Sequence, residues 1–179
     1  MNDGLIPTRY ARALYKFAME SDSAAQVYGE VKQLNKSFTD ITMQRTVDNP
    51  FIAIADKEKV LLSAAGAQKD GCLDKFVLMV IRHNRENFMR EIILQYGKIY
   101  RERNNIAQVE IVTASKMPDA KIAEIADVVK TQLAGKTIEE THTVNPELIG
   151  GFLVKVDNIV LDATIKNELK KLRLKLLSN

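Results

Sequence analysis

The spacing of apolar residues changes once along the chain, near residue 104. Before that point, apolar side chains recur at helical spacing in stretches bounded by helix signals such as Pro7, Ser23 and Gly71. From Ile106 onward, apolar and polar residues alternate, which is the pattern of a half-buried strand. The pattern predicts an all-helical bundle of about six helices over residues 1–104, followed by a small α/β domain over residues 105–179.

Two predicted helices carry more apolar residues than one packing contact requires. The helix from Pro7 to Met19 has apolar side chains beside its expected core stripe, and the helix from Cys72 to His83 is apolar almost all round. Such helices are buried on several sides, so we expect another chain to cover one of them. The expected stripe of the first helix is Ile6, Tyr10, Ala13, Leu14 and Phe17. The candidate contact residues for a partner are Tyr10, Leu14, Phe17, Val77, Leu78 and Met79.

The C-terminal third reads as a strand, a tight turn, a second strand and a closing helix. Gly150 and Gly151 allow a close backbone approach just before the first strand. Asp157 and Asn158, between two apolar runs, have the composition of a two-residue hairpin turn. Thr164 can cap the closing helix, and we expect this helix and a preceding one to cover the small sheet. The apolar stripe of the closing helix is Ile165, Leu169, Leu172 and Leu176.

This arrangement resembles the C-terminal signature of the delta subunit of rotary ATP synthases, whose mitochondrial counterpart is the oligomycin-sensitivity-conferring protein (OSCP). Ala163 stands where that family usually has glycine, although Thr164 keeps the capping hydroxyl. Near the other end, Tyr10-Ala11-x-Ala13-Leu14 is similar to the family's opening motif. The C-terminal resemblance rests on the run Asn145-Pro146-x-Leu148-Ile149-Gly150-Gly151, the hairpin, the Asp162-x-Thr164 step and the leucine-spaced final helix.

The resemblance implies a non-catalytic stator subunit that joins the alpha/beta head to the peripheral b stalk and resists rotor torque during proton-driven ATP synthesis. It implies that the N-terminal segment of the alpha subunit docks as a helix on the bundle. The C-terminal region of the b subunit would then bind the C-terminal domain, where Lys170 and Arg173 are the candidate contacts. Membrane association would be indirect, through the complex, on the cytoplasmic side of a bacterial inner membrane.

Composition and charge narrow the picture further. The apolar share of 46% suffices for packed cores, and the single Cys72 excludes an internal disulfide and fits a reducing compartment. The longest apolar run, Phe76 to Ile81, falls far short of the roughly 20 residues that span a bilayer, and no targeting leader is recognisable. The net charge of +3 is too small to indicate nucleic acid, although the closing helix is basic. Its lysines read first as a solvated face, and binding of an acidic partner helix is the alternative.

No set of residues predicts catalysis or a bound cofactor. His83 and His142 lie in different predicted domains, and Cys72 has no histidine nearby in the sequence, so we expect no metal site. Gly150-Gly151 lacks the flanking residues of a nucleotide-binding loop. The alternative function is a helical RNA-binding or transcription-associated module, whose affinity for RNA would fall steeply with salt.

Overall fold

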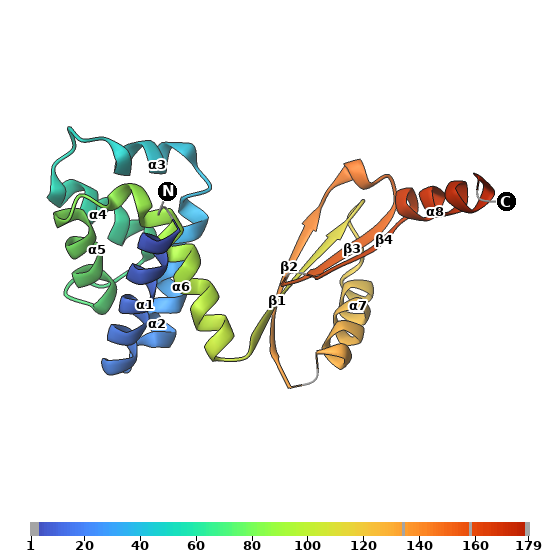
Figure 1. The fold of residues 1–179 in the computed structure, drawn as a ribbon, viewed down its shortest axis with the longest axis horizontal. Helices are drawn as coiled ribbons and strands as arrows, with labels where there is room; N and C mark the ends of the chain where they lie inside the picture. Colours follow the sequence, from blue (N-terminus) through green and yellow to red (C-terminus); the bar gives the residue numbers. More distant parts are fainter. Residues whose placement is uncertain (1–3, 134, 158, 178–179) are drawn as a thin grey trace. The chain divides into compact units, whose positions relative to one another are not determined.

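The structure, a computed structural model, describes residues 4–133, 135–157 and 159–177 (Figure 1). The chain divides into two compact units, residues 1–103 and residues 104–179. The first unit is a helical bundle, and the second contains a sheet with helices, as the sequence predicted. The helices of the bundle are α1 (Leu5–Glu20), α2 (Ala24–Ser37), α3 (Ile41–Asp48), α4 (Ile54–Ala65), α5 (Cys72–Arg82), the short 3-10 helix η1 (Glu86–Phe88) and α6 (Met89–Arg103).

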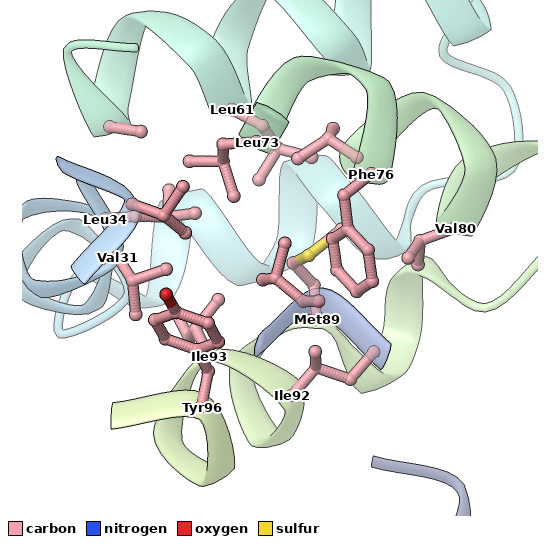
Figure 2. Close-up of a cluster of buried hydrophobic side chains, with 14 of the residues drawn as sticks. Val31, Leu34, Leu61, Leu73, Phe76, Val80, Met89, Ile92, Ile93 and Tyr96 are labelled. Atoms are coloured by element: carbon pink, nitrogen blue, oxygen red, sulfur yellow. The ribbon is translucent and has the colours of Figure 1, made fainter. Parts of the chain in front are cut away.

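Helix α6 lies at the centre of the bundle core. Four of its side chains, Met89, Ile92, Ile93 and Tyr96, are fully or almost fully buried among residues of the other helices (Figure 2). The Tyr96 hydroxyl donates a hydrogen bond of 3.1 Å to the carbonyl oxygen of Ala24, which ties α6 to the start of α2. The core is therefore built around the last helix of the unit.

Helix α1 packs on this core in a different rotation from the expected one. Its buried residues are Pro7, Ala11, Leu14 and Ala18. Tyr10, which the predicted stripe placed in the core, is only half-buried, and Phe17 is exposed. The predicted stripe is therefore wrong by about one helical position, and the small side chains at 11 and 18 face the interior instead.

The second unit is a mixed four-stranded sheet with the strand order β2-β1-β3-β4. β1 pairs in parallel with β2, whereas β3 is antiparallel to both β1 and β4. The β3–β4 hairpin closes with Val156 opposite Ile159, although Asn158 of the expected turn lies outside the described residues. The elements are β1 (Ile106–Thr113), α7 (Asp119–Gln132), β2 (Thr137–Val144), the 3-10 helix η2 (Pro146–Leu148), β3 (Gly151–Val156), β4 (Ile159–Thr164) and α8 (Ile165–Leu177).

Helix α7 covers one face of this sheet, whereas α8 does not cover either face. Val109, Ile111 and Val154 of the sheet are buried with Ala126 of α7, so this core is small. The leucines of α8 remain exposed, and none of the residues described in that helix is buried. The expectation that two helices cover the sheet is therefore wrong for α8.

The start of α8 is fixed by short-range contacts around Thr164. The Thr164 hydroxyl accepts a hydrogen bond of 3.2 Å from the Asn167 backbone N–H, which confirms the predicted cap. The same hydroxyl and the Thr164 N–H both donate to Asp162 Oδ1, at 2.6 and 2.9 Å. Gly151 has a φ of +80°, and a Cβ there would collide with the Ala163 carbonyl oxygen, so the close backbone approach requires glycine.

Candidate docking surfaces

The first candidate surface, called the α1–α5 face below, is made up of the predicted contact residues that are not fully buried, which are Tyr10 and Phe17 on α1 and Leu78 and Met79 on α5. The two helices run antiparallel, because the Tyr10 ring meets Phe76 edge-on at 6.4 Å, whereas Phe17, further along α1, shares a cavity with Cys72 at the start of α5. That cavity holds about 290 Å³. Phe17 is 37% exposed, and Leu78 and Met79 are half-buried. These side chains leave apolar contact area on α1 and on α5 that is open to a partner.

Two of the predicted contact residues do not belong to this face. Leu14 and Val77 both have 0% of their surface exposed. Leu14 shares the inward side of α1 with Ala11 and Ala18, and Val77 shares the inward side of α5 with Phe76 and other core residues. They stabilise the bundle and leave no area for a partner, so the prediction is corrected for both.

The second candidate surface is an apolar groove between α7 and the β3–β4 hairpin, called the α7–hairpin groove below. Its cavity holds about 480 Å³. Val128 on α7 is 65% exposed, and Ile159 and Leu161 on β4 are 72% and 58% exposed. The lining residues are Ile125, Val128, Val129, Leu133, Phe152, Val154, Val156, Ile159 and Leu161.

The sequence analysis missed this groove, although the strand pattern contains a signal for it. Val154 pairs with Leu161 and Val156 pairs with Ile159, so the apolar residues of both strands share one face. The exposed face of α7 adds Val128 beside them. Alternation within each strand, combined with the two-residue turn, would have placed these residues together.

The third candidate surface is the apolar stripe of α8. Monomeric proteins rarely leave contiguous large apolar side chains in water, so an uncovered stripe indicates an interaction site. Lys170 and Arg173, the predicted stalk contacts, are exposed on the same helix. The stripe residues are Ile165, Leu169, Leu172 and Leu176, which are 50%, 60%, 55% and 81% exposed.

A network of hydrogen bonds joins the end of β4 to the start of α8. The side-chain and backbone hydrogen bonds from Thr164 lower the pKa of Asp162 below its usual value, so this carboxylate is ionised at neutral pH. The Asn167 side chain donates a further hydrogen bond of 3.2 Å to the Asp162 carbonyl oxygen. Asp162, Thr164 and Asn167 therefore form one connected cap at the base of the stripe.

The two histidines and the cysteine make structural contacts and do not form a reactive arrangement. The Nδ1 atom of His83 lies 2.7 Å from the Met79 carbonyl oxygen, and the Nε2 atom of His142 lies 3.0 Å from the Thr113 hydroxyl. Burial raises the pKa of the Cys72 thiol, which disfavours a reactive thiolate. The described part of the chain contains no cluster of three or more His, Cys, Asp or Glu side chains that could hold a metal ion. Among the same residues, no helix has the length and apolar character needed to cross a membrane.

The fold and its uncovered apolar surfaces can be compared with known proteins. The family described as ATP synthase delta (OSCP) subunit matches residues 6–176. The chain belongs to this family. It is therefore a non-catalytic stator subunit of ATP synthase, part of a complex that couples proton transport to ATP synthesis. Membership of this family decides against the alternative function, an RNA-binding module. The chain is a subunit of ATP synthase that is peripheral to the membrane.

Individual relatives agree with this membership over nearly the whole chain. ATP synthase subunit delta of Parabacteroides distasonis is 32% identical over 180 residues, covering 100% of this chain and 99% of the relative. The Phocaeicola vulgatus subunit is 32% identical over 172 residues, covering 95% and 92%. A chain in the cryo-EM structure of the Toxoplasma gondii mitochondrial ATP synthase hexamer has a TM-score of 0.75 at 20% identity, covering 96% of this chain and 97% of that one. That likeness shows a shared fold.

Proposed function

We propose that this subunit holds the catalytic head to the peripheral stalk through surfaces on its two separate units. The N-terminal segment of the alpha subunit docks on the α1–α5 face, and the C-terminal region of the b subunit docks on the second unit. The observation that carries the proposal is that each unit leaves its own apolar surface uncovered. A linker that resists torque needs two such surfaces and no reacting groups.

On the head side, the α1–α5 face suits a short amphipathic helix. Helix-in-groove recognition uses apolar anchors that project every three or four residues into a seam between two helices. Phe17 and Tyr10 lie two turns apart on α1, and Leu78 and Met79 lie on the antiparallel α5. A helix laid across this face would therefore meet apolar side chains of both helices.

On the stalk side, the α7–hairpin groove and the stripe of α8 favour an apolar helix with acidic flanks. The stripe accepts leucine-like side chains, and the basic residues of the same helix attract negative charge. In residues 164–179 the only acidic residue is Glu168, and the basic ones are Lys166, Lys170, Lys171, Arg173 and Lys175. We place this assembly on the cytoplasmic side of a bacterial inner membrane, where the subunit attaches only through the complex.

The test on the head side is calorimetric titration of the full chain with a peptide of the same organism's alpha N-terminus. We expect one-to-one binding that Leu78→Asp weakens at least tenfold, which corresponds to about 1.4 kcal/mol. The matched control is Leu94→Asp, because Leu94 is 46% exposed on α6 and is not part of the face. Unchanged affinity of a folded Leu78→Asp variant would refute the assignment.

The stalk side is tested with a fragment that spans the C-terminal region of the b subunit, and with two single variants of this chain. Leu172→Asp places a charge in the stripe, and Val128→Asp places one in the groove. Both side chains are more than half exposed, so both variants should fold. We expect either variant to weaken b binding at least tenfold and to leave alpha-peptide binding unchanged. Full b binding by both variants would move the stalk site elsewhere.

A further inference from the structure

Asp74, in the first turn of α5, is a buried carboxylate, and only one of its two oxygens accepts a hydrogen bond from a described residue. The residue is only 6% exposed. Its Oδ2 atom accepts a hydrogen bond of 2.6 Å from the backbone N–H of Asp70. Its Oδ1 atom is buried and has no hydrogen-bond donor among the described residues. A buried acceptor without a donor is costly, so this oxygen needs an explanation.

The neighbouring group is the carboxyl of Glu58 on α4, which lies within hydrogen-bonding reach of the Asp74 carboxyl. An ionised carboxylate cannot donate a hydrogen bond, but a protonated one can. Burial, followed by the hydrogen bond to Asp74 and the charge of Asp74, raises the pKa of Glu58, while Lys69 and Arg82 oppose the shift. These groups come from α5 and from the loop that joins it to α4.

The surroundings decide which of the two carboxyl groups keeps the proton. Asp74 lies in the first turn of α5, where the helix dipole favours a negative charge, and it already accepts the Asp70 N–H. Glu58 has neither advantage, because it lies within α4 beyond the first turn. We infer that Glu58 and Asp74 hold one proton between them, which Glu58 donates to Oδ1 of Asp74, and that this bond ties α4 to α5.

The inference fixes the sign of a pH dependence. Below the ordinary glutamate pKa of 4.5, Glu58 is protonated in both the folded and the unfolded chain. As the pH rises above that value, the unfolded chain releases the proton first, so the stability of the bundle falls until Glu58 also ionises in the folded state. Because α5 carries Leu78 and Met79, the proton would also steady the α1–α5 face; this last step alone rests on the proposed function.

The test is Glu58→Gln in the full chain, because an amide donates to Asp74 Oδ1 at every pH. All five tyrosines lie within residues 1–104, so near-ultraviolet circular dichroism of tyrosine reports unfolding of the bundle. We expect the variant to melt about 4–8 °C above the natural protein at pH 8. At pH 4 we expect the two midpoints to coincide. NMR titration of Glu58 should give a pKa above 4.5 that Asp74→Asn lowers.

The matched control is Glu20→Gln, which removes an exposed carboxylate on α1 and should leave the pH trend unchanged. A Glu58 that titrates at its ordinary value, together with no gain from Glu58→Gln, would overturn the inference. It would also be overturned if calcium, rather than protons, stabilised the natural protein at pH 8 and failed to stabilise Glu58→Gln. Neither readout uses the head or the stalk, so this inference can fail independently of the docking proposal.

Discussion

The helical bundle and the C-terminal domain use their apolar residues in opposite ways. In the bundle, buried apolar side chains from six helices converge on one core that includes Met89 and Tyr96. Among the described residues of the C-terminal domain, the buried cluster consists of Val109, Ile111, Val154 and Ala126, and large apolar side chains of β4 and α8 face water. Both units leave apolar surface uncovered, but the bundle also has a large core of its own, whereas the described core of the C-terminal domain is small.

The difference shows where each unit obtains its stability. A bundle with a large core of its own needs no partner to fold, so the face that we propose for docking can be shallow. A small domain that leaves a groove and a helix stripe open gains stability from whatever fills them, because a ligand that binds only the folded state stabilises it. We therefore expect the proposed docking of the b subunit to stabilise the C-terminal domain more than the proposed docking of the alpha subunit stabilises the bundle.

The largest expected effect comes from a matched pair of leucine substitutions, one in each unit. Leu14→Ala empties a site that is 0% exposed, and we expect it to destabilise the bundle by about 2–5 kcal/mol. Leu172→Ala trims a side chain that is 55% exposed, and we expect a change within about 0.5 kcal/mol. Urea unfolding followed by tyrosine measures the first, and hydrogen exchange of β3 amides measures the second. A loss above about 1 kcal/mol for Leu172→Ala would mean that α8 packs on its own domain.

A second test asks whether the bundle core also depends on a polar contact. Lys57 is 3% exposed, and its Nζ atom lies 2.7 Å from Oε1 of Glu86, an ion pair that ties α4 to η1. Oε2 of Glu86 is also buried, and the described residues offer it no donor. Lys57→Met would leave this carboxylate buried without a partner, so we expect a loss of about 3 kcal/mol in urea unfolding.

The double variant Lys57→Met with Glu86→Leu is the control for the ion pair. Replacing both partners by apolar residues of similar size is often nearly neutral, so the double variant should recover most of the loss. If the double variant stays as unstable as Lys57→Met alone, the loss does not come from the broken ion pair. It then comes from the packing of the Lys57 side chain.

The features that could be predicted from the sequence are those that depend on neighbouring residues. Helical spacing located the helices of the bundle, and the hydroxyl of Thr164 and the glycine at 151 marked the base of α8 and the sharp approach before β3. These features depend on residues only a few positions apart. The same locality allowed the family resemblance to be read from short motifs at both ends of the chain.

What the sequence could not predict depends on packing between distant segments. The apolar side of α1 spans so much of its circumference that Leu14 and Phe17 looked equivalent, and only packing against the shared core of the bundle shows that Leu14 faces inward. The ion pair between Lys57 and Glu86 of η1 joins residues that are 29 positions apart in the sequence. The exposure of the α8 stripe could not be predicted either. A leucine repeat shows that one side of a helix packs against something, but it does not show whether that partner is the same chain or another.

The smallest expected effect tests how α8 is held without a packed face. Thr164 is 4% exposed and its hydroxyl caps the helix, so Thr164→Val keeps the shape and removes the cap. We expect a loss of about 1 kcal/mol, seen as faster hydrogen exchange in the first turn of α8. The pKa of Asp162 should rise toward its usual value, because the strongest hydrogen bond that lowers it is lost.

The matched control for this cap is Thr131→Val, which removes a hydroxyl that bonds within α7 and should change little. The folded pKa of Asp162 is lowered, so the stabilisation from its ionised form is present above the usual aspartate pKa and is lost as the pH falls. Thr164→Val should therefore weaken the acid sensitivity of α8 as well as its cap. If exchange in α8 stays as slow as in the natural protein, the stripe is held by contacts along the helix, and the contrast between the two units is smaller than their exposed leucines indicate.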